Sequence, residues 1–279
     1  MDLVTTATHR SGRRFEVSTA SGHTFPVEGK PDEPAPTAGP GPMELMLVSL
    51  ATCSGVTLAD LLPRMRQPVD ALEVRVAGDR APTPPRVWTE IHVTYRVRGA
   101  CDDARIRRAV EMAEGKYCSA SVMLSRVAKL TGSIEVIRPV EAAETRELRR
   151  QILRPHQTTD ELVVPGEDHP DAGWFGVVKD GELVGSAGVF PEPSPDAPEA
   201  PAWRLRAMAV DESVRGSGLG AWLLAACQDH VDAHGGGRVW ASVRVPAAGF
   251  YERHGFVAVS EVWEEPEIGP HVRMVRAPR

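Results

Sequence analysis

The apolar and polar positions of the first part of the chain predict a small sheet, a loop and one long helix. Residues 2–28 alternate apolar and polar side chains around turns at 11–12 and 21–22, a pattern typical of antiparallel strands joined as a meander. Prolines and glycines crowd residues 30–42, which predicts a loop. Residues 43–62 are apolar nearly all round, which is typical of a helix that is buried on every side.

A second group of strands and helices is predicted within residues 71–137. Asp102 is a suitable N-cap for a helix that runs to Glu111. Further elements are predicted as a strand at 71–76, a helix at 119–130 and a strand at 133–137. Strict alternation predicts one more strand at 87–97, with a buried apolar face and a wet face made of Trp88, Glu90, His92, Thr94, Arg96 and Arg98.

The last half of the chain reads as strands interrupted by helices. The runs 174–178 and 182–190 flank Lys179-Asp180-Gly181, and Asp-Gly is a strong hairpin signal. A helix is predicted at 141–153, because Pro155 ends the helical pattern. The other predicted strands are 203–210, 238–243, 256–264 and 268–274.

The stretch 203–227 changes period in its middle, as an anion-binding turn requires. An apolar strand ends at Val210, and residues at helical spacing begin at Leu219. Small residues between them let backbone N–H groups converge, and a helix start adds unsatisfied donors and the positive end of its dipole. We therefore expect a pyrophosphate to bind here, the alternative being a connection that binds nothing. The turn consists of Arg215, Gly216, Ser217, Gly218, Leu219 and Gly220.

Composition narrows the class of protein. The 279 residues suggest about two domains, and 42% hydrophobic residues suffice for a core in each. A net charge of −6 argues against a nucleic-acid partner. The uncharged run 45–59 is short for a membrane span, and the first residues show no signal-peptide pattern. Four scattered cysteines form neither a secreted disulfide framework nor a zinc site, so a cytoplasmic location without a metal is expected.

A second motif supports the interpretation of residues 215–220 as a pyrophosphate-binding turn. Residues 247–256 read Ala-Ala-Gly-Phe-Tyr-Glu-Arg-His-Gly-Phe, which predicts a short helix that carries Phe250 and Tyr251. The order of strand, Arg-x-x-Gly-x-Gly, helix, strand and Ala-x-x-Phe-Tyr-x-x-x-Gly-Phe resembles the GNAT family of acetyl-CoA-dependent N-acyltransferases. The resemblance implies a mixed sheet flanked by helices, acetyl-CoA as cofactor and a small-molecule amine as acceptor.

The GNAT resemblance also implies roles for particular residues. Tyr251 would be the general acid toward the CoA thiolate, the alternative being a packing aromatic. Arg244 stands where many GNAT sequences have asparagine, a departure at a position that usually contacts the cofactor. The general base stays open among Asp211, Glu212 and His271. The amides of Arg215–Gly220 would hold the pyrophosphate, and the pantetheine arm and acetyl group would lie against the backbone of Met208, Ala209 and Val210.

Two cysteines of the first half occur in a suggestive order. Cys53 lies in the middle of the long apolar helix, and Cys118 falls at a helix N-terminus, where a thiolate is stabilised. The order of the elements is also informative: strands come first, then a helix that starts Gly-Pro-Met-Glu-Leu and carries Cys53, then two strands, then Tyr-Cys-Ser at the start of a helix. This order resembles the OsmC/Ohr family of thiol-dependent peroxidases over about residues 3–137. By position, the resemblance makes Cys53 the attacking thiol and Cys118 the resolving thiol. An organic hydroperoxide would be the substrate and a dithiol the reductant.

Several features of this half stay open. The family uses an arginine from the first strands, for which Arg10, Arg13 and Arg14 are all candidates. Met43 stands where the hydroperoxidases carry glutamate, and Glu44 follows one position later, about 100° around the helix. Cys53 alone would be a small core residue, since unpaired cysteines are commonly buried. The family forms intertwined dimers, which implies a homodimer.

Together the patterns predict an α+β protein with two domains. Residues 1–136 are expected to form an OsmC-like sheet with a long buried central helix, and residues 137–279 a GNAT acetyltransferase. The expected function combines acetyl transfer to an amine with reduction of organic hydroperoxides. The alternative is a non-catalytic acetyl-CoA sensor on an OsmC-like dimerisation scaffold.

Overall fold

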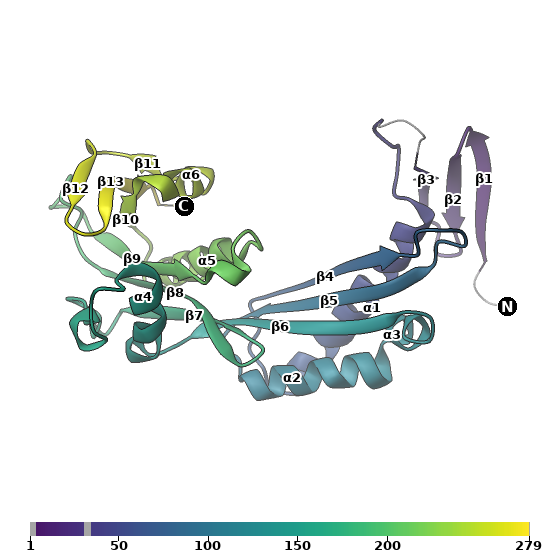
Figure 1. Cartoon of the computed structure of the whole chain (residues 1–279), viewed down its shortest axis with the longest axis horizontal. Helices are drawn as coiled ribbons and strands as arrows, with labels where there is room; N and C mark the ends of the chain where they lie inside the picture. The colour runs from purple at the N-terminus through teal and green to yellow at the C-terminus, as the bar shows by residue number, and fades with distance from the viewer. Residues whose placement is uncertain (1–3, 31–34, 279) are drawn as a thin grey trace. The chain divides into compact units, whose positions relative to one another are not determined.

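The computed structural model describes residues 4–30 and 35–278 as two compact units, each with helices and strands (Figure 1). The first unit consists of the residues up to Leu61, Val74–Thr94 and Ala109–Gly132. The second consists of Leu62–Glu73, Tyr95–Arg108 and the residues from Ser133 onward. The predicted α+β class is confirmed.

The first unit begins with the predicted meander. Strands β1 (Thr5–Ser11), β2 (Arg14–Thr19) and β3 (Thr24–Glu28) pair antiparallel in that order. Figure 1 shows the three strands side by side. Parts of the sequence-based ranges, residues 2–3 of the meander and 31–34 of the loop, lie outside the described residues.

Helix α1 (Pro42–Arg64) is buried along one stripe only. Leu50, Ser54 and Leu58 are fully buried, and their spacing of four residues places them on one face. Val48 and Val56 are 46% and 65% exposed. The prediction of a helix buried on every side is therefore wrong for a single chain, because only this stripe finds partners within it. By length and composition α1 would also pass as a membrane span, a test that core helices of soluble proteins pass too.

Strands β4 (Ala71–Arg80), β5 (Trp88–Arg98) and β6 (Lys129–Pro139) are neighbours in the order β6-β5-β4. The apolar face of β5 is buried as predicted, but Trp88 and Arg96 on the expected wet face are buried too. Trp88 covers Gly78, where a β-carbon would lie only 2.9 Å from the indole.

Helix α2 (Asp103–Met112) begins as predicted, because Asp102 Oδ1 accepts the Arg105 N–H at 2.9 Å. A π-helical turn, η1 (Ala113–Tyr117), leads to α3 (Ser119–Leu124). The predicted helix 119–130 is too long, since β6 starts at Lys129 and not at 133. Pairing with β5 explains the longer strand, with Thr131 Oγ1 2.8 Å from His92 Nδ1 across it.

In the second unit the strands follow the order β11-β13-β10-β9-β8-β7-β6. The predicted hairpin is confirmed, because Asp180 and Gly181 both have the positive φ that its turn needs. The predicted strand 256–264 is wrong as one element, since two short strands, β11 and β12, pair separately with β13. The bounds are β7 (Gly173–Lys179), β8 (Glu182–Pro191), β9 (Ala202–Val210), β10 (Arg238–Arg244), β11 (Val257–Ala258), β12 (Trp263–Glu265) and β13 (Gly269–Arg276).

Helices α4 and α5 cover opposite faces of this sheet. Phe175 packs against the core that α5 helps to form, while Arg149 of α4 lies over the ring of the preceding residue, Trp174. Successive residues of a strand point to opposite faces, so the two helices lie on opposite sides. The helices are η2 (Ala142–Thr145), α4 (Arg146–Leu153), η3 (Asp160–Leu162), η4 (Glu212–Val214), α5 (Leu219–Ala233), η5 (Val245–Ala247) and α6 (Ala248–Arg253).

Candidate functional site

Strands β9 and β10 are paired only at their beginnings. Their parallel register joins Arg238 to Ala202, Val239 to Trp203 and Trp240 to Arg204, and it ends there. The later residues of both strands diverge, which leaves the backbone of β9 from Leu205 onward without this neighbour. A wedge therefore opens within the sheet.

A bulge in β9 accompanies the divergence. The register against β8 shifts between Ser186 and Gly188, and Ala207 has a φ of 54°, in the left-handed region. The Ser186 hydroxyl donates to the Ala207 carbonyl at 3.0 Å, which satisfies an acceptor that the bulge takes out of the ladder. Ala207 carries no motif, and the sequence analysis missed it.

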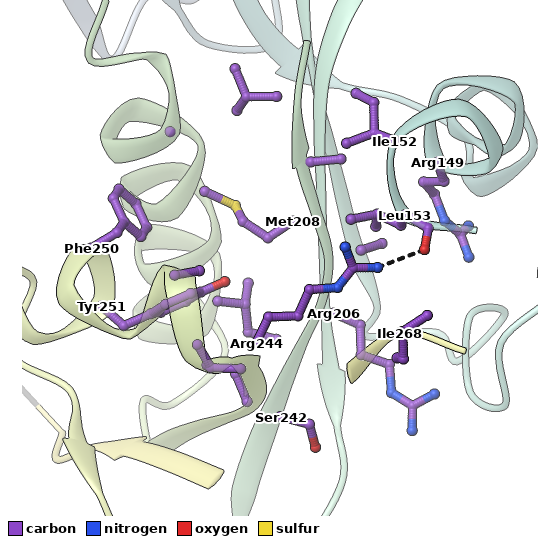
Figure 2. A pocket seen from close by; sticks show the side chains of 18 of the residues that line it. Arg149, Ile152, Leu153, Arg206, Met208, Ser242, Arg244, Phe250, Tyr251 and Ile268 are labelled. Atoms are coloured by element: carbon purple, nitrogen blue, oxygen red, sulfur yellow. Dashed lines mark hydrogen bonds between the residues drawn. The ribbon is translucent and has the colours of Figure 1, made fainter. Parts of the chain in front are cut away.

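A cavity of about 1010 Å³ occupies the wedge (Figure 2). It is lined by β9, β10, the glycine-spaced turn, α4 and α6. Of the nine residues predicted to bind the cofactor, Ser217 is the one that does not line the cavity. The other eight do so: Met208, Ala209, Val210, Arg215, Gly216, Gly218, Leu219 and Gly220. Their binding role stays a prediction.

The glycine-spaced turn has the backbone shape of an anion-binding loop. Gly216 and Gly218 have φ values of 78° and 90°, which favour glycine, and α5 starts at the next residue, Leu219. Ser217 is turned inward, since its hydroxyl donates to the Val214 carbonyl at 2.7 Å. Left-handed residues before a helix start direct backbone N–H groups toward a common point, where an anion is stabilised.

Arg96, which belongs to the second unit, holds this turn through a hydrogen bond to its backbone. Its side chain is 5% exposed and donates to Glu135 Oε2 at 2.8 Å and to Glu73 Oε1 at 3.1 Å. Another of its N–H groups donates to the Ser217 carbonyl at 3.0 Å, and its guanidinium lies over the Trp222 ring. Strand alternation predicted that Arg96 is exposed to solvent. This prediction is wrong, because two carboxylates and a carbonyl compensate the cost of burying its charge. Nothing in the sequence signals these partners.

Tyr251, on helix α6, also lines the cavity. Its residue is 7% exposed, and Figure 2 shows the hydroxyl directed into the cavity. Among the described residues no side chain or carbonyl forms a hydrogen bond with this hydroxyl. Burial raises the pKa of Tyr251 above its usual value, so the phenol stays protonated at neutral pH.

The three candidate bases differ in position. Asp211 accepts the Ser213 hydroxyl and, at 2.9 Å, the Ser213 N–H, and these bonds lower the pKa of Asp211. The side chain of Glu212 is 91% exposed. His271 lines the cavity, with Nδ1 2.8 Å from the Gly269 carbonyl oxygen. Of the three, the cavity therefore offers His271.

Cys53 and Cys118 lie side by side in the first unit. Cys118 is fully buried at the N-cap of α3, as predicted, and its sulfur accepts the Ser54 hydroxyl and the Ser121 N–H, both at 3.4 Å. The Cys53 thiol is partly exposed and within hydrogen-bonding reach of Cys118.

The pKa values of the two thiols shift in opposite directions. Burial raises the pKa of Cys53, and the neighbouring Cys118 raises it further. Burial also disfavours a Cys118 thiolate, but hydrogen bonds from Ser54, Cys53 and Ser121 prevail and lower the pKa of Cys118. The accessible thiol is thus the less acidic one. The two thiols are within hydrogen-bonding reach of each other, and a nearby cation would favour a thiolate on Cys53.

The described residues of one chain do not supply that cation from the predicted arginines. Arg10 forms an ion pair with Glu16, and Arg13 donates to the Lys30 carbonyl at 2.7 Å. Arg14 stands opposite Glu28 in the β2–β3 register. Glu44 accepts the Gly41 N–H at 3.1 Å and so caps the start of α1.

These features define two sites: a cavity between the parted strands β9 and β10, and a pair of thiols, one on α1 and one at the N-cap of α3. The profile of the family described as OsmC-like protein matches residues 32–131, and that of the acetyltransferase (GNAT) family matches residues 141–256. The chain belongs to the OsmC-like family through its first half and to the GNAT acetyltransferase family through its second half.

Individual relatives resemble one half each. Protein YhfA of Escherichia coli K12 is 34% identical over 127 residues, which are 45% of this chain and 92% of YhfA. The uncharacterized N-acetyltransferase YitI of Bacillus subtilis is 32% identical over 144 residues, 51% of this chain and 96% of YitI. A crystal structure of an OsmC-like protein from Mycoplasma pneumoniae superposes with a TM-score of 0.44 at 18% identity, covering 49% of this chain and 97% of that one.

The Arg96 network generates a prediction about both stability and binding. Arg96→Met leaves Glu135 buried without its cation, so the free energy of unfolding should fall by about 3–5 kcal/mol in urea titrations. The double variant Arg96→Met/Glu135→Leu removes both charges and should recover most of this loss. Its acetyl-CoA affinity, measured by calorimetry, should still be reduced because the Ser217 carbonyl has lost its donor. Wild-type affinity in the double variant would show that Arg96 does not position the turn.

Proposed function

We propose that the second half of the chain transfers the acetyl group of acetyl-CoA to a small-molecule amine. The observation that carries this proposal is the cavity, because it brings together the glycine-spaced turn, the part of β9 that does not pair with β10 and the Tyr251 hydroxyl. Each is a group that acyl transfer requires. Membership of the GNAT acetyltransferase family supports the same reaction.

The cavity residues suit the steps of an amine acylation. When bound, acetyl-CoA supplies the thioester whose acetyl group moves to the amine. The amides from Arg215 to Gly220 would hold its pyrophosphate, and the backbone of Met208–Val210 its pantetheine arm and acetyl group. Amides that polarise the carbonyl stabilise the charge that develops on attack. Tyr251, protonated because it is buried, would give its proton to the leaving thiolate, and His271 would receive the proton of the amine.

Tyr251→Phe tests this assignment. The change keeps the ring and removes the proton, so turnover should fall by about 10²- to 10⁴-fold while acetyl-CoA affinity stays close to that of the wild type. Calorimetry measures binding, and release of free CoA thiol across an amine library measures turnover. Equal turnover in both proteins, with chemistry limiting, would reduce Tyr251 to a packing residue. A wild-type protein that binds acetyl-CoA and acetylates no amine would be a sensor and not an enzyme.

For the first half we propose a thiol-dependent reduction of organic hydroperoxides. The adjacency of Cys53 and Cys118 supports it, since a sulfenic acid formed beside a second thiol condenses to a disulfide. In the balanced reaction, Cys53 attacks the peroxide, the alcohol leaves and sulfenic acid remains. Cys118 then displaces water, and a dithiol restores both thiols. A reducing cytoplasm, the location we propose, would supply that dithiol.

A stoichiometric dose of cumene hydroperoxide should therefore join Cys53 to Cys118. Peptide mapping by mass spectrometry should find Cys101 and Cys227 still reduced, because both are buried and neither adjoins another thiol. In Cys118→Ser, oxidation should stop at sulfenic acid on Cys53, which a carbon nucleophile traps. If Cys53 and Cys118 are both still reduced after peroxide treatment of the wild type, the first half of the chain is a scaffold and the peroxidase proposal fails.

We also propose that the protein is a homodimer. The exposed side of α1 carries Val48 and Val56, and an exposed apolar patch of this kind is a surface that a second copy can cover. Dimers of the resembled family place their thiol sites at the interface. A second copy would then bring its β1–β2 arginines to the Cys53 that lacks a cation in its own chain.

Val56→Glu should break this association. A buried, unpaired carboxylate at an apolar interface is costly, so sedimentation velocity should show a monomer where the wild type shows a dimer. Val262→Glu is the matched control, because Val262 is similarly exposed at 58% but lies in the second unit. A monomeric wild type, or a Val56→Glu protein that is still dimeric, would argue against this interface.

A further inference from the structure

We propose that the amine accepted by the cavity also carries a carboxylate, as an amino acid does, and that Arg244 and Arg154 bind this group. The inference rests on the proposed acetyltransferase function and names its class of acceptor. It comes from the part of the cavity that is lined by the last residues of α4 and by Arg244, the last residue of β10.

Arg244 is the last residue of β10 and extends across the wedge. One of its terminal N–H groups donates to the Leu153 carbonyl at 2.7 Å, the bond drawn in Figure 2. A guanidinium has five N–H donors, and among the described residues Arg244 makes no other hydrogen bond and no ion pair. Most of its donors therefore face the cavity.

Arg154 meets Arg244 at the same carbonyl. Its Nη1 donates to the Leu153 oxygen at 3.1 Å, so the two guanidinium groups lie within two hydrogen-bond lengths of each other. Burial lowers the pKa of Arg154, and the positive charge of Arg244 lowers it further. Two like charges held together in a partly buried place are unfavourable unless an anion offsets them.

The carboxylates nearby do not fully offset these charges. Glu265 acts on Arg154 but lies beyond ion-pair distance, and its Oε2 accepts the Trp263 indole N–H at 3.1 Å. Glu161 accepts the N–H and the hydroxyl of Thr158. Arg204, by contrast, is neutralised by Glu192 at 2.6 Å. The Arg244–Arg154 pair is thus one part of the cavity where positive charge exceeds negative charge.

The position of the pair indicates a carboxylate close to the reacting amine. Arg244 directly precedes η5 and α6, the short segment that carries Tyr251, so both residues reach the same cavity from one stretch of chain. A planar guanidinium pair matches the two oxygens of a carboxylate. An α- or β-amino acid, whose two groups are one or two carbon atoms apart, fits this arrangement better than a long diamine.

The experiment compares α-amino acids with their carboxamides and their decarboxylated amines, using glycine, alanine, leucine, phenylalanine and glutamate. For the preferred side chain, wild-type kcat/KM should favour the acid over both neutral analogues by about a hundredfold, because a neutral analogue leaves charged donors unpaired. In Arg244→Gln this preference should fall below about tenfold, mainly through a higher KM for the acid. Acetyl-CoA affinity, measured by calorimetry, should change by less than about twofold.

Arg238→Gln is the matched control. Arg238 starts the same strand and pairs with Asp196 outside the cavity, so its loss should leave the preference intact. An unchanged preference in Arg244→Gln, or amides accepted as well as acids by the wild type, would overturn the inference while acetyl transfer stands. An equal loss of acetyl-CoA affinity would assign Arg244 to the cofactor and overturn it too. A wild type that acetylates none of the amines would overturn the proposed function and the inference with it.

Discussion

The parting of β9 from β10 is the constraint on which the rest of the acetyltransferase half depends. A sheet that stayed paired would hydrogen-bond the backbone of β9 to its neighbour and leave no space between them. The bulge at Ala207, with its carbonyl satisfied by Ser186, interrupts the β8–β9 ladder in the part of β9 that lines the cavity. The same parting gives Arg244 a gap to cross and Tyr251 a space to enter. Local backbone strain at one alanine is thus linked to the whole site.

The two halves offer different kinds of chemistry. In the proposed reaction the thiol pair would work through proximity, since two neighbouring sulfurs can exchange a proton or form a bond with little rearrangement. The cavity would work through fixed donors, because the turn, the start of α5 and the arginines present positive charge before any ligand arrives. In the first half the acidity lies on the buried sulfur and the accessibility on the other, an asymmetry that a second subunit would have to correct.

Local patterns were sufficient for the features that local chemistry determines. The meander, the Asp180-Gly181 hairpin, the Asp102 cap and the glycine-spaced turn follow from turn residues and period. The errors arose where distant partners decide. α1 looked fully buried because apolar residues such as Val48 and Val56 also stand on its exposed side. Arg96 looked solvent-exposed because alternation does not show Glu135. Nothing near Arg244 or Ala207 in the sequence reveals the carbonyl or hydroxyl that each one meets.

Arg96, which donates to the Ser217 carbonyl of the glycine-spaced turn, limits where the chain can be divided. Arg96 is encoded within the residues that match the OsmC-like family, yet its contacts place it with Ser217 and Glu135 in the second unit. A fragment cut at the family boundary would be complete as an acetyltransferase sequence and would still lack the arginine behind its own turn. Exchanging the first half for a free-standing relative would therefore also exchange the arginine that donates to the turn of the second half.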